Sequence, residues 1–295
     1  MNYKGELQQK IILINNYLDK LISANKNTPA KIIYESMNYS IFAGGKRLRP
    51  VLMLSAFEAV GGKGQIVYPF ACALEMIHTY SLIHDDLPDM DNDDFRRGKL
   101  TNHKVYGEGL AILAGDALLN LAFETMIKAT RENFSKEALD AMDVIASAAG
   151  ARGMIGGQVV DLISENQEIN MDNLNYIHKN KTTAIIQAAL KAGGILGKGS
   201  KKEIKYLEEF GYCIGMAFQI QDDILDICGN EEELGKPIKS DEKNKKATYV
   251  SIKGLDESKK HVEALSQEGL VKLEDFKEKG QFLSWLSQHL MSRTY

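Results

Sequence analysis

The chain has few cysteines and no long run of uncharged apolar residues. Only Cys72, Cys213 and Cys228 occur in 295 residues, without CxxC spacing, so they predict neither a disulfide framework nor a cysteine metal site. No 18-residue uncharged apolar run exists, which argues against a membrane span. The N-terminal apolar burst is too short for a signal peptide, and no small-residue cleavage site follows it. We therefore expect a cytoplasmic protein with no targeting segment and no membrane partner.

The net charge restricts the partners. Lys and Arg total 36 against 40 Asp and Glu, giving a formal charge of −4. A general nucleic-acid binder usually carries the opposite bias, so we expect no nucleic-acid partner and only local basic sites. The composition, 44% hydrophobic and 26% charged, is that of a soluble globular chain.

Strand signals are almost absent, and the hydrophobic spacing is helical nearly throughout. We expect helices to begin after Thr28-Pro29 and at Pro50 and Pro69, and to end at Gly44-Gly45, Gly61-Gly62 and Pro88. Further helices are expected over roughly 109–129, 135–164, 172–196, 201–228 and 247–264, with a last one at the C-terminus. The GGQVVDL segment, with Gly156 and Gly157, indicates a helix interruption. No linker or repeat is present, so we predict one all-α domain over 1–295.

The strongest chemical signal is HTYSLIHDDLPDMDNDDFRRG, residues 78–98. Six Asp fall within ten positions, directly after 15 mostly apolar residues: Asp85, Asp86, Asp89, Asp91, Asp93 and Asp94. Carboxylates at the end of a buried helix are costly unless something neutralises them. Oxygen ligands suit Mg²⁺, which is often shared with substrate phosphates. The alternative is a solvated acidic turn; the EF-hand spacing is absent.

A second acidic motif, AFQIQDDILDICG, carries Asp222 and Asp226 at i,i+4, with Asp223 one step round the helix. Apolar neighbours predict that this helix is also largely buried. Two such motifs predict one cavity in which carboxylates face each other across bridging metals. The alternative is a pair of unrelated acidic helix ends.

Basic residues gather near Gly44–Arg49, at Arg96-Arg97, at Lys181, and at Lys236 and Lys246. Any one of these pairs is more often a solvated surface charge. Beside acidic metal motifs, however, Arg and Lys are the residues that hold phosphates. The sequence thus predicts at least one metal-bridged polyphosphate site and favours a second anionic site.

The chain resembles the short-chain trans-isoprenyl diphosphate synthases, most closely the bacterial-type farnesyl diphosphate synthases. The resemblance spans nearly the whole chain, and its motifs occur in the order GGKRLRP, DDLPDMDNDDFRRG, HKNKTTA, FQIQDDILD, LGKP and KATY. It implies an all-α bundle of central helices around a deep apolar cavity, with the two Asp motifs facing each other at the mouth. It also implies about three Mg²⁺, for which Mn²⁺ could substitute, and a homodimer.

The resemblance also implies residue roles. The metal ligands would be Asp85, Asp86 and Asp91 for two ions, and Asp222, with Asp223 and Asp226 in support, for the third. The allylic diphosphate and the reacting carbon would meet the catalytic residues Arg96, Lys181, Thr182 and Gln219, together with Lys236. Isopentenyl diphosphate would be held by Lys46, Arg49, His78 and Arg97. Tyr80 and Ser81 would line the tunnel of the growing chain, where an aromatic residue resembles the C15-producing pattern. Asp89 and Ala247 depart from the usual family residues, and His84 has no assigned role.

The implied reaction is a trans-prenyl transfer. An allylic diphosphate, dimethylallyl or geranyl, ionises to a carbocation that joins isopentenyl diphosphate head-to-tail, with farnesyl diphosphate as the main product. No GxSxG or Cys/His signature indicates a protein nucleophile.

Four other readings are a geranylgeranyl diphosphate synthase, a regulatory subunit, a class I terpene cyclase or head-to-head synthase, and a metal-buffering protein. Lys46, Arg49 and Arg97 argue against a cyclase or head-to-head synthase. The two intact Asp motifs argue against a regulatory subunit. The basic clusters are unexplained by metal buffering.

Overall fold

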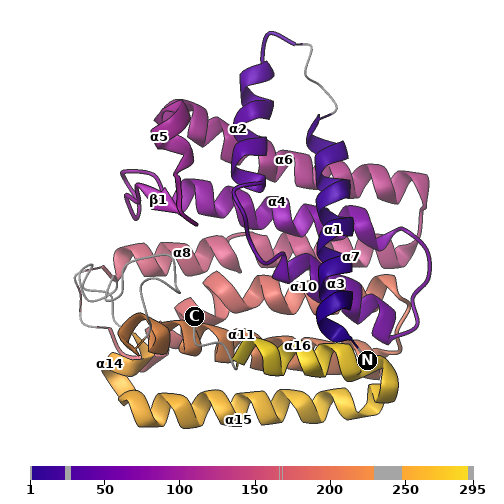
Figure 1. The fold of residues 1–295 in the computed structure, drawn as a ribbon. Coiled ribbons are helices and arrows are strands. Elements are labelled where there is room, and N and C mark those ends of the chain that lie inside the picture. Colours follow the sequence, from indigo (N-terminus) through magenta and orange to yellow (C-terminus); the bar gives the residue numbers. More distant parts are fainter. Residues whose placement is uncertain (1, 24–27, 166, 168, 229–247, 292–295) are drawn as a thin grey trace. The chain divides into compact units, whose positions relative to one another are not determined.

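Helices form nearly all of the computed structural model of the protein (Figure 1). The structure describes residues 2–23, 28–165, 167, 169–228 and 248–291. The chain divides into two compact units. Unit 1 comprises residues 1–54 and 64–138, and unit 2 comprises residues 55–63 and 139–295. Within the described residues the strands are one two-stranded hairpin, so the predicted all-α class is confirmed.

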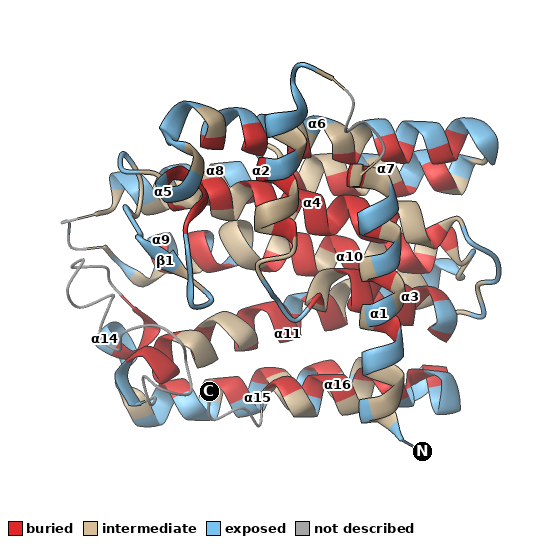
Figure 2. Cartoon of the chain, turned by 45° about the horizontal axis from the view of Figure 1, so that its top comes forward, coloured by how far each residue is buried: buried red, intermediate tan, exposed pale blue. Residues whose placement is uncertain are grey.

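Unit 1 is organised around one buried helix. Its elements are α1 (Tyr3–Ile22), α2 (Lys31–Ile41), the start of α3 (Leu48–Ala59), α4 (Val67–Asp85), β1 (Phe95–Arg96), β2 (Lys99–Leu100), α5 (Asn102–Tyr106) and α6 (Glu108–Glu132). α4 is apolar on nearly every face, which is why it lies at the centre and packs along α6, with α1 and α2 also against it. Figure 2 shows α4 buried along most of its length.

His84 connects the last turn of α4 to α6. The His84 Nε2 atom lies 3.0 Å from the Ile112 carbonyl oxygen and 4.0 Å from an Asp116 carboxylate oxygen. A Cβ atom at Gly115 would overlap the His84 ring. The absent side chain at Gly115 therefore lets the end of α4, where the first Asp motif begins, approach α6.

Unit 2 is built along its longest helix. It contains α7 (Lys136–Ala149, whose first turn lies in unit 1), α8 (Met154–Ile163), α9 (Met171–Ile177), η2 (His178–Thr183), α10 (Ala184–Leu196), α11 (Lys201–Cys228), α14 (Tyr249–Lys253), α15 (Leu255–Leu273), η3 (Glu274–Gly280) and α16 (Gln281–Met291). α11 packs against α10, η2, α15 and α16, and Figure 1 shows α11, α15 and α16 side by side. Its second half, with Ile220 and Ile224, belongs to an apolar cluster that also includes Tyr249.

Several boundaries differ from the prediction. The helix expected over 135–164 is two helices, because the chain turns between α7 and α8, where the Gly153 amide donates to the Gly150 carbonyl. The interruption predicted at Gly156 and Gly157 is wrong, since α8 runs through both. α2 begins at Lys31 rather than directly after Pro29.

Toward the C-terminus, the helix expected over 247–264 is interrupted at Gly254, which has a φ of 80°. Residues 178–183, within the helix predicted over 172–196, form a π-helix. Pro50 and Pro69 lie in the first turns of α3 and α4, as predicted.

Among the described helices, α6 alone is long and apolar enough to cross a membrane, by length and composition only. Of its most apolar window, 39% is buried inside the protein. α6 packs along α4.

We expect Gly115→Ala to lower the free energy of unfolding by about 1–3 kcal/mol, because the added methyl group would displace the His84 ring. Gly109→Ala in the same helix is the matched control, since a Cβ atom there meets nothing within 4 Å. That change should be neutral or stabilising by up to about 1 kcal/mol. Urea unfolding monitored by circular dichroism measures both variants. Equal effects would contradict the close approach at Gly115.

Candidate active site

The first Asp motif is a closed loop at the end of α4. α4 ends at Asp85, with Asp86 as its C-cap. The Asp91 amide donates to the Asp85 carbonyl at 2.8 Å, and the Asn92 amide donates to the Leu87 carbonyl at 3.1 Å. These two hydrogen bonds fold the intervening residues into a turn. The backbone of Asp91 is thereby returned to the helix end that carries Asp85 and Asp86.

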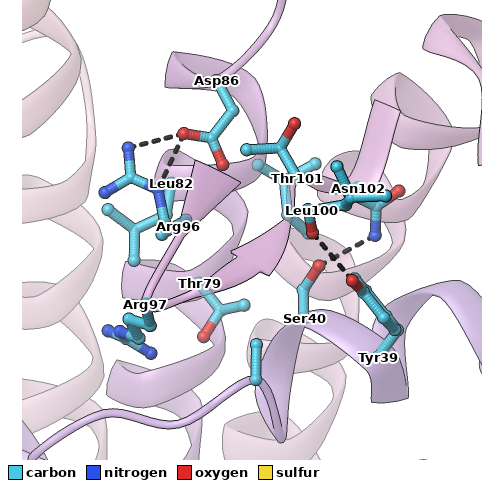
Figure 3. Close-up of a pocket in the computed structure, with 12 residues that line it drawn as sticks. Tyr39, Ser40, Thr79, Leu82, Asp86, Arg96, Arg97, Leu100, Thr101 and Asn102 are labelled. Atoms are coloured by element: carbon cyan, nitrogen blue, oxygen red, sulfur yellow. Dashed lines mark hydrogen bonds and ion pairs between the residues drawn. The ribbon is translucent and has the colours of Figure 1, made fainter. Parts of the chain in front are cut away.

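Asp86 and Arg96 form an ion pair beside this loop. The β1–β2 hairpin brings Arg96 back, and its Nε and Nη2 atoms lie 2.7 and 2.5 Å from Asp86 Oδ1 (Figure 3). Asp86 is buried, and burial raises the pKa of its carboxyl group. Arg96 opposes that rise, whereas the charges of Asp93 and Asp91 add to it. The loop therefore carries more negative charge than Arg96 compensates.

A cavity of about 30 Å³ lies between the end of α4 and the β1–β2 hairpin. Figure 3 shows the Asp86–Arg96 pair and Arg97 among its lining residues. Across the cavity, the Tyr39 hydroxyl donates to the Leu100 carbonyl at 2.7 Å. The cavity brings together three of the predicted site residues.

The glycine turn before α3 holds Arg97. Gly44 and Gly45 have φ values of 112° and 125°, which favour glycine. The Arg97 Nη1 atom donates to the Gly44 carbonyl, and a Cβ atom at Gly45 would lie 2.6 Å from that Nη1. Only a residue without a side chain leaves room for the guanidinium here, so GGKRLRP and RRG, far apart in sequence, meet at this turn.

His78 lies in the electrostatic field of the same arginines. Burial lowers the pKa of His78, and the positive charges of Arg49, Arg97 and Arg96 lower it further. His78 is therefore neutral at pH 7, and its imidazole can donate one hydrogen bond and accept another. Lys46 on the same turn is exposed and Arg49 is half-buried. The structure thus places the predicted isopentenyl-site residues in one region of unit 1.

Arg47 also lowers the pKa of His78, but its guanidinium is bound to an internal partner, unlike the prediction that grouped it with its basic neighbours. Its guanidinium is buried and lies 2.8 Å from Glu75 of α4. Sequence reasoning missed Glu75, and the signal was available: an acidic residue in the otherwise apolar run FACALEMI must have a buried partner.

In unit 2, the π-helix η2 carries the predicted catalytic residues Lys181 and Thr182. The Lys181 Nζ atom lies 2.6 Å from Asp161 of α8. A Cβ atom at Gly157 would overlap the Lys181 backbone, so α8 touches η2 directly at that glycine. Asp161, in the GGQVVDL segment, is thereby identified as the partner of Lys181.

A chain of hydrogen bonds links η2 to the second Asp motif. The Thr182 hydroxyl donates to Gln219 Oε1 at 2.9 Å, and Gln219 Nε2 donates to Asp223 Oδ1 at 3.2 Å. Asp223 Oδ2 accepts from the Tyr249 amide at 2.7 Å and lies 3.5 Å from His178 Nε2. The structure therefore brings Thr182, Gln219 and Asp223 together, and it adds His178 and Tyr249. Both added residues lie in or next to the quoted motifs HKNKTTA and KATY.

Of the other two acidic residues of the second motif, Asp226 is buried and Asp222 is half-buried. Lys236, Lys246 and Ala247 lie outside the described residues. The first motif belongs to unit 1 and the second to unit 2. The convergence of the two motifs on one cavity stays a prediction.

Tyr80 and Ser81 lie on α4 one to two turns before Asp85. Tyr80 is 5% exposed, and its ring packs edge-on against His84 at a centroid distance of 5.7 Å. Burial, with a contribution from Asp85, raises the pKa of Tyr80 to about 12. Ser81 is half-buried and donates to the His78 carbonyl at 2.9 Å. A buried aromatic ring suits both the predicted tunnel floor and an ordinary packed side chain.

No group of three or more His, Cys, Asp or Glu side chains within the described part of the chain is close enough to hold a metal ion by itself. The donor chemistry at the first motif nevertheless fits Mg²⁺. Its donors are carboxylate oxygens. Burial, with a smaller contribution from the charges of Asp93 and Asp91, raises the pKa of Asp86, and a bound cation would stabilise the ionised carboxylate. Mg²⁺ usually takes only one or two protein carboxylates and completes its shell with water and phosphate oxygens.

A sequence model of the Polyprenyl synthetase family matches residues 30–282. Farnesyl diphosphate synthase from Geobacillus stearothermophilus is 46% identical over 85% of this chain and 84% of its own. Geranylgeranyl diphosphate synthase from Cyanophora paradoxa is 43% identical over 97% of this chain and 95% of its own. The crystal structure of an FPP/GFPP synthase from Zymomonas mobilis superposes with a TM-score of 0.88 at 31% identity, covering 99% of both chains.

The site and the fold together define a prenyltransferase. The chain belongs to the polyprenyl synthetase family, and the predicted resemblance is confirmed. Prenyl diphosphates are the substrates that fit this family.

We expect the free energy of unfolding to fall as the pH drops from about 6.5 to about 4. Burial lowers the pKa of His178 to about 4, so the unfolded chain binds a proton in this range that the folded chain excludes. His178→Asn should reduce this pH dependence, as measured by urea unfolding at pH 7, 6 and 5. His289→Asn in α16 is the control. An unchanged slope in His178→Asn would contradict a buried neutral imidazole.

Proposed function

We propose that the protein condenses isopentenyl diphosphate head-to-tail with dimethylallyl or geranyl diphosphate, with (2E,6E)-farnesyl diphosphate as the main product. One observation supports the proposal: unit 1 groups residues that suit two anion sites of different chemistry. The Asp loop at the end of α4 suits a metal-bound diphosphate. The cluster of Arg49, His78 and Arg97 suits a diphosphate held without metal. Two such sites match a reaction that joins two diphosphates, whereas a cyclase binds one.

The metal-binding residues of the proposal are Asp85, Asp86 and Asp91 at the first motif and Asp222, Asp223 and Asp226 at the second. When bound there, Mg²⁺ neutralises the allylic diphosphate and makes it a better leaving group. We propose about three ions for each active site, and this requires the two motifs to converge. The two units would then act as one domain over residues 1–295.

The chain's own residues orient the substrates and shelter the charge. Arg96 and Lys181, with Lys236, would contact the allylic diphosphate, and each described cation already has a carboxylate partner that orients it. The allylic C–O bond breaks, and the double bond of isopentenyl diphosphate forms the new C–C bond. The oxygens of Thr182 and Gln219, ordered by the hydrogen bond to Asp223, would stabilise the positive charge. C2 of the isopentenyl unit then loses a proton. We propose that the departing diphosphate accepts it.

Product length is the finer part of the proposal. The named relatives include both farnesyl and geranylgeranyl diphosphate synthases. We favour the C15 product because Tyr80, on α4 near Asp85, is a large ring buried where a shorter side chain would leave space. A geranylgeranyl diphosphate synthase is the alternative of the same family, and a non-catalytic subunit of a heteromeric synthase is the alternative of another class.

We also propose a cytoplasmic homodimer. Support comes from α8, where four large apolar side chains recur at helical spacing and are 40–61% exposed: Ile155, Val159, Leu162 and Ile163. An apolar stripe of this kind on a surface helix marks a protein contact. The few unpatterned cysteines suit a reducing compartment.

We expect Asp85→Ala and Asp222→Ala each to lower the turnover of isopentenyl diphosphate by a factor of about 100 or more, because each removes a ligand for the ions that activate the leaving group. Asp89→Asn, an exposed residue of the same loop, is the matched control and should stay within about twofold of wild type. Radiolabelled isopentenyl diphosphate with Mg²⁺ measures all four proteins, with circular dichroism to check folding. Wild-type rates in either Ala variant would refute the metal assignment. An inactive wild-type protein would favour the regulatory subunit.

We expect wild type to release mainly a C15 product and Tyr80→Ala to release longer chains, because truncating the ring opens space beyond the allylic tail. Product chromatography after incubation with dimethylallyl and isopentenyl diphosphate measures the chain length. Tyr80→Phe is the control, because it keeps the ring and removes only the hydroxyl group. A wild-type C20 product would support the geranylgeranyl alternative, and an unchanged product in Tyr80→Ala would remove Tyr80 from the tunnel floor.

A further inference from the structure

Arg47 is bound through three nitrogen atoms of its guanidinium group. Its Nε donates to Asn15 of α1 at 2.8 Å, its Nη1 to Glu75 of α4 at 2.8 Å, and its Nη2 to the Ile41 carbonyl at the end of α2 at 2.6 Å. The side chains of Arg47 and Glu75 are 3% and 1% exposed. The Arg47 guanidinium therefore links α1, α4 and the end of α2.

The backbone at Arg47 has an uncommon conformation that accompanies its buried side chain. Its φ is 49°, in the left-handed region that residues with side chains seldom adopt, and Lys46 separates it from Gly44 and Gly45, which also have positive φ. The Val51 amide donates to the Arg47 carbonyl at 3.1 Å, so Arg47 also starts α3. Holding a residue in this conformation costs free energy, which the three hydrogen bonds of the guanidinium offset.

The contacts of Arg47 also restrict the positions of its basic neighbours, Lys46 and Arg49. Lys46 precedes Arg47 on the exposed turn, and Arg49 follows two positions later in the first turn of α3. Glu75, the partner of Arg47, lies one turn before His78 on α4. The ion pair therefore links the segment that carries Lys46 and Arg49 to the helix that carries His78.

We propose that Arg47, held by Glu75 and Asn15, is a positioning residue that sets Lys46 and Arg49 in register with His78 for the binding of isopentenyl diphosphate. The inference rests on the proposed function for the identity of that ligand. Arg47 does not touch the ligand. It acts by fixing the turn, and a lysine would not replace it, because an ammonium group does not present the three planar donor directions that these acceptors occupy.

The test separates positioning from general stability. Arg47→Lys should raise the KM for isopentenyl diphosphate by about tenfold and leave the KM for the allylic substrate within about twofold. Leu118→Ala, a fully buried change in α6, is the stability control. An equal rise of both KM values in Arg47→Lys, or the same selective rise in Leu118→Ala, would overturn the proposal.

Substitutions of Asn15 test the same proposal if Arg47→Lys does not fold. Asn15→Ala should raise the same KM by about threefold, because it removes one acceptor of the guanidinium. Asn15→Asp, which keeps an acceptor oxygen, should restore the wild-type value. Asn16→Ala, the exposed neighbour, is the matched control and should have no effect. Equal KM values for Asn15→Ala and Asn16→Ala would overturn the proposal.

Titration with inorganic diphosphate without metal distinguishes the failure of this inference from the failure of the proposed function. If the wild-type protein does not consume isopentenyl diphosphate, the proposed function fails. The diphosphate titration, followed by calorimetry, still tests the role of Arg47. Weaker diphosphate binding by Arg47→Lys and Asn15→Ala than by wild type and Asn16→Ala would support positioning of the cationic turn. Equal binding by all four proteins would overturn it.

Discussion

The energetic constraint on this protein is negative charge at the ends of two buried helices. Asp86 follows α4, whose faces are nearly all apolar, and Asp223 and Asp226 lie in the buried half of α11. A carboxylate removed from water is stable only when donors or cations replace the lost hydration. Arg96 supplies that replacement to Asp86, and Gln219 with the Tyr249 amide supplies it to Asp223. The neighbouring loops and helix starts are arranged around these donors.

Close approach of neighbouring groups is the second requirement, and glycine permits it in four places. Gly115 admits the His84 ring, Gly45 admits the Arg97 guanidinium, and Gly157 lets α8 touch the backbone of Lys181. Gly215 of α11 adjoins Thr183 on the same π-helix. A π-helix is wider than an α-helix and is often found at functional sites. Here it carries Lys181 and Thr182 between two helices that bear small residues at the contact.

The cations of the GGKRLRP segment divide into two that we propose to bind substrate and one that holds neighbouring helices together. Arg47 faces inward, where a buried charge is stable only because three acceptors surround it. Lys46 is exposed and Arg49 is half-buried, and we propose that these two hold the anionic ligand. The two arginines of GGKRLRP, separated by Leu48, thus differ in burial and in proposed role. The match to the family carries over the reaction class, whereas the named relatives include both farnesyl and geranylgeranyl diphosphate synthases, so product length belongs to the proposal.

The sequence by itself determined the helical class, the two acidic motifs and the family, because apolar spacing of three and four and clustered carboxylates are local features of the chain. Hydrogen bonding, local backbone conformation and packing decided the rest. The pairs Arg47–Glu75 and Lys181–Asp161 join residues 28 and 20 positions apart, and no local pattern specifies which acid a cation meets. The interruption expected at Gly156 and Gly157 is a continuous helix. Gly157 serves the contact with the Lys181 backbone of η2, and Gly156 lies against the Ala151 carbonyl. A glycine in a sequence marks a position without a side chain. Only the packed neighbours show whether that position is needed for a turn or for the close approach of another group.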